Sequence, residues 1–292
     1  MPPEPPSLSL MLGMMRLHER PELQAPERLA DWIEARLDQG LEWFDHADIY
    51  GGEGLNEHLF GKALHRRPSL ARRVRVVTKA GIRMNRGDIK HYDSSPDWLT
   101  GAIDRALSRL GTERLDVFLI HRPDPLMEAE TTARVLDDAV RDGKIAALGV
   151  SNFLPDQWRR LQSALSSPLR HHQLQLSLNH SSPLFDGHFD ALRQDGLSPM
   201  AWSPLGGGAL FEGQAGRLLE NIAAHHGVSP AGVALAWLRR LPGSPMPVIG
   251  TLDPTRITTL RDEAELSLSR QEWYALLEAA RGHEAARGHE VA

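Results

Sequence analysis

The sequence predicts an α/β fold, a single (β/α)8 TIM barrel in which eight parallel strands alternate with helices. Eight short apolar runs are separated by segments of helical periodicity, which is the pattern of a parallel sheet covered on both faces. The length of 292 residues suits one such barrel, because this fold commonly takes about 250 residues. We therefore expect one domain over residues 1–292, with flexible tails at 1–7 and about 282–292.

Apolar runs and helix boundary residues place the elements along the chain. The expected strands are Ser9 to Met15, Leu41 to Phe44, Val74 to Thr78, Leu115 to Ile120, Ile145 to Val150, Gln173 to Leu178, Pro199 to Trp202 and Pro247 to Ile249. The expected helices are Pro26 to Gly40, Gly54 to Leu64, Pro96 to Leu110, Thr131 to Asp142, Pro155 to Ala164, Phe185 to Asp195, Gly216 to His226, Ser229 to Arg240, Pro254 to Glu263 and a last one from Ser269. The polar connection from Arg83 to Ser95 is long for such a fold, so it is a candidate for substrate contacts.

Composition excludes several classes of protein. Lysine and arginine number 33 against 38 acidic residues, a net charge of −5, so the chain lacks the basic surface that nucleic acids or anionic membranes require. There is no cysteine, which rules out disulfides, thiolate nucleophiles and cysteine-ligated metals. No signal peptide and no apolar run of roughly 18 residues is present. We expect a cytoplasmic protein with a small-molecule partner, as a monomer or weak homo-oligomer.

Titratable side chains follow three of the expected strands. Asp45 and then Tyr50 follow the second strand, Lys79 follows the third, and His121 follows the fourth. Asp45 and Asp48 could instead cap the helix that begins near Leu55. The repetition at three strand ends favours a site, because active sites of barrels lie where the strands end.

The residue types Asp45, Tyr50, Lys79 and His121 suit proton transfer. A tyrosine has an ordinary pKa of about 10, and a nearby lysine ammonium should lower that pKa by stabilising the phenolate. Asp45 would hold Lys79 charged and in place. By contrast, the adjacent His171 and His172 point to opposite faces of a strand, so we interpret them as structural and expect no metal site.

The ordered motifs resemble the aldo-keto reductase family, and most closely its bacterial YdhF-like oxidoreductases. The matching segments are Asp45 with Tyr50-Gly51, Val77-Thr78-Lys79, Leu115-Asp116 with Leu119-Ile120-His121, Gly149 to Phe153, Gln173, Ala201 to Gly206, and Ile249-Gly250-Thr251 with Arg256. These segments occur in order from about Leu8 to Arg281.

The resemblance implies NADPH-dependent, reversible reduction of an aldehyde or ketone. Tyr50 would protonate the carbonyl oxygen and His121 would orient it. Family roles place the nicotinamide on Ser151, Asn152 and Gln173, with its ring against Trp202, for which an ordinary core position is the alternative. The pyrophosphate would lie along Ser203, Leu205 and Gly206. Thr251 and Arg256 would meet the 2′-phosphate.

One departure concerns the choice between NADPH and NADH. The family often has a lysine directly before the hydroxyl residue at the 2′-phosphate, and Gly250 stands there in this chain. Arg256 remains at its matching position, where a guanidinium can grip a phosphate, although it could also be a solvated surface charge. NADPH stays the expected cofactor and NADH the less favoured one.

Two other classes of function are compatible with parts of the sequence. The first is a nicotinamide-nucleotide-binding regulatory subunit with little turnover, since some members of this fold family regulate channels. The second is a metal-dependent hydrolase that uses His46, Asp48 and His121.

Overall fold

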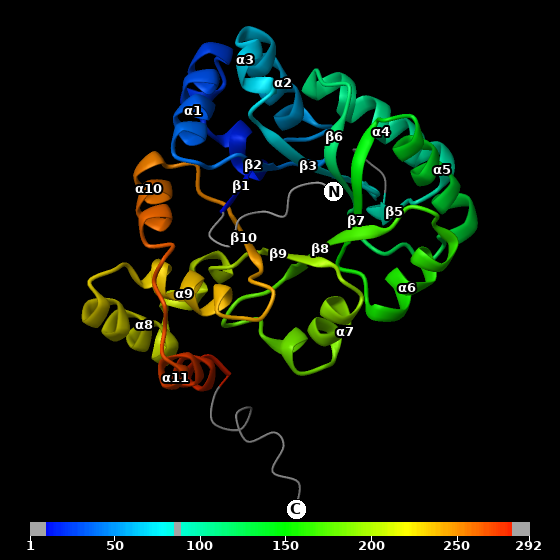
Figure 1. The fold of residues 1–292 in the computed structure, drawn as a ribbon. Helices are drawn as coiled ribbons and strands as arrows, with labels where there is room; N and C mark the ends of the chain where they lie inside the picture. Colours follow the sequence, from blue (N-terminus) through cyan, green and yellow to red (C-terminus); the bar gives the residue numbers. More distant parts are fainter. Residues whose placement is uncertain (1–9, 85–88, 282–292) are drawn as a thin grey trace, which may run out of the picture.

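A computed structural model describes residues 10–84 and 89–281, which contain a closed barrel of parallel strands (Figure 1). The predicted tails at 1–7 and 282–292 lie outside these residues. The barrel strands are β1 (Met11–Gly13), β2 (Trp43–Asp45), β3 (Arg75–Ala80), β6 (Leu115–Ile120), β7 (Ile145–Ser151), β8 (Leu169–Gln175), β9 (Ser198–Trp202) and β10 (Met246–Ile249). The strands neighbour one another in chain order and β10 pairs with β1, so the predicted (β/α)8 barrel is confirmed.

Helices surround the barrel on its outside (Figure 1). The α-helices in the described ranges are α1 (Pro26–Asp38), α2 (Leu55–Arg66), α3 (Pro68–Ala71), α4 (Pro96–Leu110), α5 (Ala129–Arg141), α6 (Pro155–Ala164), α7 (His188–Gln194), α8 (Gly213–His226), α9 (Pro230–Arg239), α10 (Pro254–Asp262) and α11 (Arg270–Arg281). Short 3-10 helices are η1 (Met14–Glu19), η2 (Pro21–Leu23), η3 (Ser182–Leu184) and η4 (Gly206–Phe211). Within the ranges that the structure covers, no helix has the length and apolarity to cross a membrane.

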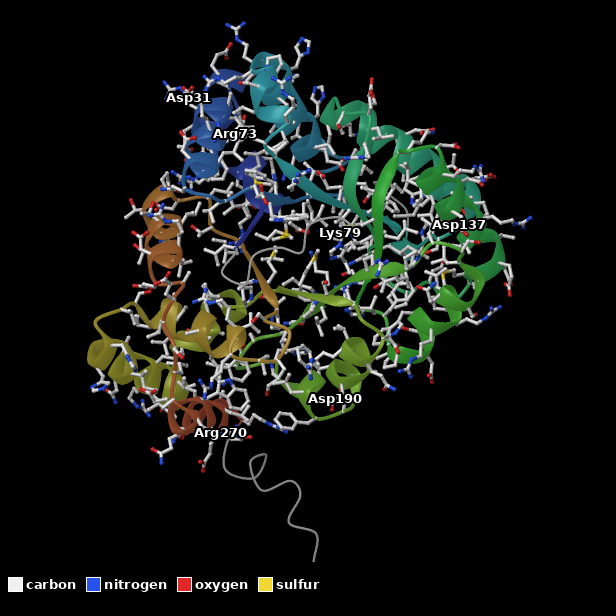
Figure 2. All side chains as sticks on the ribbon, viewed as in Figure 1. Asp31, Arg73, Lys79, Asp137, Asp190 and Arg270 are labelled. Carbon is white, nitrogen blue, oxygen red and sulfur yellow. The ribbon has the colours of Figure 1, made fainter. Side chains whose placement is uncertain are left out.

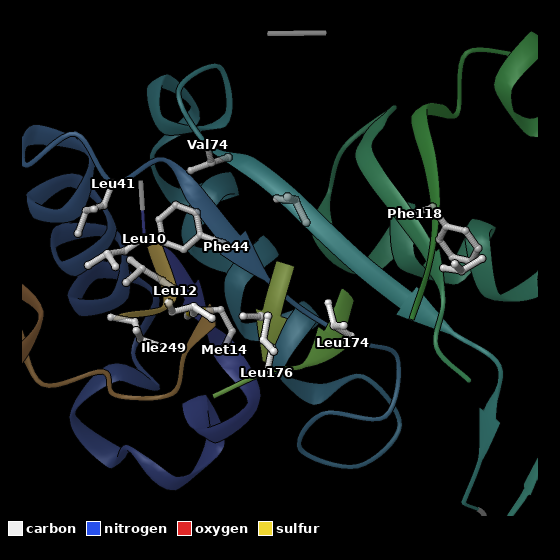
Figure 3. Close-up of a cluster of buried hydrophobic side chains, with 14 of the residues drawn as sticks. Leu10, Leu12, Met14, Leu41, Phe44, Val74, Phe118, Leu174, Leu176 and Ile249 are labelled. Carbon is white, nitrogen blue, oxygen red and sulfur yellow. The ribbon is translucent and has the colours of Figure 1, made fainter. Parts of the chain in front are cut away.

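Two apolar cores lie on the two sides of the barrel wall. Outward-facing strand residues pack beneath the helices, and Leu12, Phe44 and Ile249 belong to this outer core (Figure 3). The barrel interior is filled by a second cluster made of Met11, Trp43, Val77, Val117, Leu119, Ala147, Met200, Met246 and Val248. The alternation follows from the two-residue period of a strand, so one row of each strand faces the interior.

The inner rows explain why polar residues gather at one end of the barrel. The row of β2 runs from Trp43 to Asp45, and that of β3 runs from Val77 to Lys79. Two residues beyond Leu119, the inner row of β6 reaches His121. These rows are apolar until their carboxyl ends, so the polar side chains close the same end of the interior.

Some boundaries differ from those predicted from the sequence. The strand predicted as Gln173 to Leu178 is β8, Leu169–Gln175, which pairs with β7 from Leu169 onward and with β9 up to Gln175. The polar residues at its start hid this strand, although His171 and His172 are buried. Helix α7 begins at His188 and not at Phe185.

The long connection after β3 contains structure that the sequence did not predict. Strands β4 (Ile82–Arg83) and β5 (His91–Tyr92) form a small antiparallel pair at its base. Residues 85–88 lie outside the described part of the chain. The pair therefore folds part of this connection back on itself beside the end of β3.

Two tryptophans join the last helix to the rest of the fold. The rings of Trp237 in α9 and Trp273 in α11 stack with centroids 5.0 Å apart and planes 7° from parallel. Each indole N–H donates to the other residue's carbonyl oxygen, over 3.1 and 2.9 Å. This reciprocal contact, worth both burial and hydrogen bonds, anchors α11 beside α9.

Candidate active site

A buried ion pair lies at the centre of the site. Lys79 Nζ is 2.6 Å from Asp45 Oδ1 and also donates to the carbonyl oxygen of His46 over 2.7 Å. Figure 2 shows Lys79 within the ring of strands, whereas Asp190 and Asp137 lie out on the helices. Burial lowers the pKa of Lys79, and the charge and hydrogen bond of Asp45 oppose that shift. Asp45 thus holds Lys79 in place, and it does not cap α2, whose N-cap residue is Gly54.

Gln173 contacts the same carboxylate, a contact that the sequence did not predict. Its Nε2 donates to Asp45 Oδ1 over 2.7 Å, and the side chain is buried. Strand β8 carries this amide across the barrel interior from β2. The side-chain nitrogen of Gln173 therefore fixes Asp45, and only its amide oxygen is without a hydrogen bond from the described residues.

Tyr50 and His121 meet above the ion pair. Their ring centroids are 6.3 Å apart with the rings nearly perpendicular, and Lys79 Nζ lies 5.2 Å from the centre of the Tyr50 ring. We expected a lowered pKa for Tyr50, but in this structure burial, followed by the negative charge of Asp45, raises that pKa well above its ordinary value. Tyr50 accordingly keeps its proton at neutral pH.

His121 is held neutral. Burial lowers the pKa of His121 well below its ordinary value, and the positive charges of Lys79, Arg122 and Lys90 lower it further. A neutral imidazole can donate one hydrogen bond and accept another. Beside Tyr50, such a group is suited to orient an oxygen atom without carrying a charge.

A hydrogen-bonded chain links the ends of β7 and β9. Asn152 Nδ2 donates to Ser151 Oγ over 2.7 Å, and Asn152 Oδ1 accepts from the indole N–H of Trp202 over 2.9 Å. Asn152 has a positive φ of 61°, an uncommon conformation that asparagine tolerates better than most residues. Trp202 is only partly buried, so it is not an ordinary core tryptophan. The Arg122 guanidinium lies 5.7 Å from the ring centre of Trp202.

The segment after β9 turns sharply beside Trp202. Ser203 has a φ of 53°, and Gly206 to Gly208 all have positive φ. A Cβ on Gly206 would lie 2.4 Å from the side chain of Asn179, so glycine is required there by both conformation and space. Leu205, partly buried, precedes these glycines. A Cβ on Gly207 or Gly208 would have no neighbour within 4 Å, so the space in front of these two glycines is open.

Thr251 lies in the connection between β10 and α10, and Arg256 lies in the first turn of α10. Asp253 caps α10 by accepting from the main-chain N–H of Arg256 over 2.9 Å, and its own N–H donates to Thr251 Oγ1 over 3.2 Å. The Arg256 side chain is exposed and forms no ion pair with the residues that the structure describes. The structure thus brings the four predicted catalytic residues together with Gln173, links Ser151, Asn152 and Trp202, and leaves Thr251 and Arg256 on a neighbouring turn.

A buried acidic group behind the ion pair was not assigned a role from the sequence. Glu57 accepts from Thr78 Oγ1 over 2.6 Å and from Arg109 Nη1 over 3.3 Å. Asp48 is also buried, and burial together with the charge of Glu57 raises the pKa of Asp48 from 3.8 to about 7. Asp48 could be noticed in the sequence because it stands in the motif after β2. Glu57 could not, because it resembles any acidic residue in the first turn of a helix.

Asp48 should make stability depend on pH. The folded protein keeps the Asp48 proton up to about pH 7, whereas the unfolded chain releases it near pH 4. Stability should therefore fall as pH rises through this window. Asp48→Asn cannot ionise, so it should not lose this stability. The free energy of unfolding of the variant minus that of wild type should be about 2 to 3 kcal/mol larger at pH 8 than at pH 5. Urea unfolding at both pH values measures this difference.

Asp190→Asn is the matched control, since Asp190 is exposed on α7. Its difference from wild type should be the same at both pH values. A pH-independent difference for Asp48→Asn as well would show that Asp48 ionises normally in the folded protein.

The metal-site alternative does not fit the geometry. Within residues 10–84 and 89–281, no three histidine or acidic side chains converge as metal ligands would. His46 is fully buried with its ring edge-on to Phe60, centroids 4.7 Å apart. Burial lowers the pKa of His46 to about 3. His46, Asp48 and His121 therefore do not form the trio that a hydrolytic metal would need.

Comparison with known proteins agrees with this barrel and its polar end. The model of the Aldo/keto reductase family matches residues 9–281. The chain belongs to the aldo/keto reductase family, and it is an oxidoreductase, as the resemblance of its motifs implied.

Named relatives cover almost the whole chain. A 6-dehydroglucose reductase of Agrobacterium fabrum is 39% identical over 283 residues, which are 94% of this chain and 95% of that protein. Oxidoreductase YdhF of Escherichia coli is 37% identical over 291 residues, or 97% of both chains. The crystal structure of the thermostable aldo-keto reductase Tm1743 with the inhibitor epalrestat superposes with a TM-score of 0.81 at 26% identity, covering 95% of this chain and 96% of that one. The predicted likeness to YdhF is confirmed.

Proposed function

We propose that this protein reduces an aldehyde or ketone to the alcohol with NADPH, and that Tyr50 is the proton donor. The observation that carries the proposal is the convergence of Tyr50 and His121 over the buried Lys79–Asp45 pair. The linked residues Asn152 and Trp202 lie at the ends of β7 and β9, on either side of β8. This end of the barrel thus provides a proton donor, Tyr50, and an aromatic surface, Trp202, on which a planar ring could stack.

The residues of the chain fit a nicotinamide dinucleotide in three respects. Trp202 is partly exposed and its indole N–H is fixed by Asn152, so its ring is oriented for stacking. The open space in front of Gly207 and Gly208 permits close approach of a diphosphate. Arg256 offers a free guanidinium on the next turn. Bound NADPH would supply the hydride for the carbonyl carbon.

Proton transfer falls to Tyr50. Its raised pKa keeps the hydroxyl protonated, and His121, which stays neutral, can donate a hydrogen bond to the same carbonyl oxygen. As that oxygen gains negative charge, it takes the Tyr50 proton. The Lys79 ammonium, near the Tyr50 ring, stabilises the resulting phenolate until water restores the proton.

The relatives suggest where a substrate search should begin. The relative in Agrobacterium fabrum is named for reduction of 6-dehydroglucose, which carries an aldehyde. We propose a small polar aldehyde of this kind as the first compound to test. Residues from the connection between Arg83 and Ser95 would form part of its pocket, since this connection begins beside Lys79 at the end of β3.

Titration of the tryptophan fluorescence with each cofactor tests the proposal at its first step. NADPH should quench the emission with saturation, and a panel of aldehydes and ketones should then oxidise the bound NADPH. A protein that bound neither NADPH nor NADH would not have the proposed function.

Arg256 should determine the preference for NADPH. Losing a charge-assisted phosphate contact costs about 1.5 to 3 kcal/mol, so Arg256→Ala should weaken NADPH binding roughly tenfold or more. NADH lacks the 2′-phosphate, and its affinity should stay nearly unchanged. Fluorescence titration with both cofactors measures the two constants. An equal loss for both would mean that Arg256 does not contact the phosphate.

A further inference from the structure

Gly250, which stands where the family often has a lysine, lies beside the side chain of Arg16. Residue 250 follows Val248 on the inner row of β10, where a side chain would face the barrel end. Gly250 is not among the residues with positive φ, and a Cβ added to it would have one neighbour within 4 Å, Arg16 Nη1 at 4.0 Å. Neither conformation nor crowding therefore requires glycine here, and the space in front of it faces a guanidinium.

Arg16 reaches this place from the neighbouring strand. Strands β1 and β10 pair with Leu12 beside Ile249, and Arg16 follows in η1, just as Gly250 follows β10. The Arg16 side chain is exposed and has no hydrogen bond or ion pair with any residue in 10–84 or 89–281. Arg20, in contrast, is paired with Glu22 over 2.6 Å. Arg16 is thus a free cation next to the turn that carries Thr251 and Arg256.

The charges around the turn show why a second cation matters. The hydrogen bond from the Arg256 main chain, assisted by the positive charges of Arg256 and Arg20, lowers the pKa of Asp253. Asp253 is therefore negative at neutral pH and reduces the attraction that Arg256 alone would offer a phosphate. The unpaired Arg16 would add positive charge beside it.

We propose that Arg16 binds the 2′-phosphate of NADPH together with Thr251 and Arg256, in place of a side chain at position 250. This inference rests on the proposed function. It assigns cofactor preference to a residue at the end of β1, a strand that none of the predicted site residues comes from.

Replacement of Arg16 by methionine tests the assignment through binding. Methionine keeps the aliphatic stem and removes the charge, so Arg16→Met should weaken NADPH about tenfold and change NADH affinity by less than about twofold. Fluorescence titration measures both without turnover. Arg134→Met is the matched control, because Arg134 is exposed on α5, across the barrel, and it should leave both affinities unchanged.

A second variant asks whether the charge, and not the residue, is what matters. Because a side chain at 250 meets open space, Gly250→Lys in the Arg16→Met background should fold and restore NADPH affinity to within about threefold of wild type. Thermal unfolding of each variant confirms that the fold is kept.

The outcomes separate this inference from the proposed function. Unchanged NADPH affinity in Arg16→Met, with the expected loss in Arg256→Ala, would overturn the role of Arg16 and leave the function standing. An equal loss of NADPH and NADH would also overturn it, since the contact would then be with the diphosphate that both share. If the wild type bound no cofactor, the proposed function would fail first.

Discussion

Tyr50→Phe is expected to slow carbonyl reduction by on the order of 10²-fold or more, the usual contribution of a positioned general acid. The substitution removes one hydroxyl and keeps the ring that packs edge-on to His121. NADPH affinity should therefore stay close to that of wild type. Single-turnover oxidation of bound NADPH, with the fluorescence titration beside it, separates the chemical step from binding.

Tyr274→Phe serves as the matched control for this variant. Tyr274 is exposed on α11, away from the strand ends, so its hydroxyl should have no effect on either measurement. If Tyr50→Phe reduced carbonyls as fast as wild type with chemistry rate-limiting, another group at this end of the barrel would have to donate the proton.

Lys79→Met is expected to abolish turnover and to destabilise the fold by about 3 to 5 kcal/mol, because removing one member of a buried pair leaves the other without its counter-charge. Asp45 would keep the hydrogen bond from Gln173 and lose its counter-charge. The phenolate of Tyr50 would also lose the ammonium that lies 5.2 Å from its ring centre. Urea unfolding and single-turnover kinetics measure the two effects independently.

The double variant Lys79→Met with Asp45→Asn distinguishes charge burial from catalysis. Neutralising Asp45 removes the uncompensated charge, so part of the lost stability should return, while turnover should not. Recovery of turnover would mean that neither member of the pair assists Tyr50. A single variant as stable as wild type would contradict the energetic role that we assign to the pair.

The same measurements separate the proposed enzyme from the two other classes. A regulatory subunit would bind the cofactor and show negligible turnover in the wild type. A metal-dependent hydrolase would lose activity to a chelator and would be insensitive to loss of the Tyr50 hydroxyl.

The barrel and the positions of its polar residues could be predicted because they follow from short-range patterns. Apolar runs such as Leu115 to Ile120 identify strands whichever neighbours they have. The start of strand β8 was misplaced because its first residues are not apolar. The polar run Arg170, His171 and His172 resembles a turn. Burial of His172 against α6 and α7 is a tertiary effect, visible in its ring contacts with Trp158 at 5.0 Å and with His188 at 5.1 Å.

The sequence predicted which side chains converge and predicted their contacts less well. Asp45, Lys79 and His121 could be named because each stands at or just after a strand end, and Tyr50 because it follows in the loop after Asp45. The bond from Gln173 to Asp45 spans 128 residues along the chain, and no local pattern encodes it. The direction of the pKa shift of Tyr50 depends on its burial and on the nearby charge of Asp45. The place of Arg16 depends on pairing between the first and last strands.

Transfer of an isotope tests the central claim most directly. NADPH that carries deuterium in place of the transferred hydrogen should deliver it to the carbonyl carbon of a small aldehyde, and mass spectrometry should find one deuterium in the alcohol. With Tyr50→Phe the same labelled alcohol should form at a rate lower by on the order of 10²-fold. An alcohol without deuterium, or no consumption of NADPH across the panel of carbonyl compounds, would contradict the assignment of this barrel end as a carbonyl reductase site.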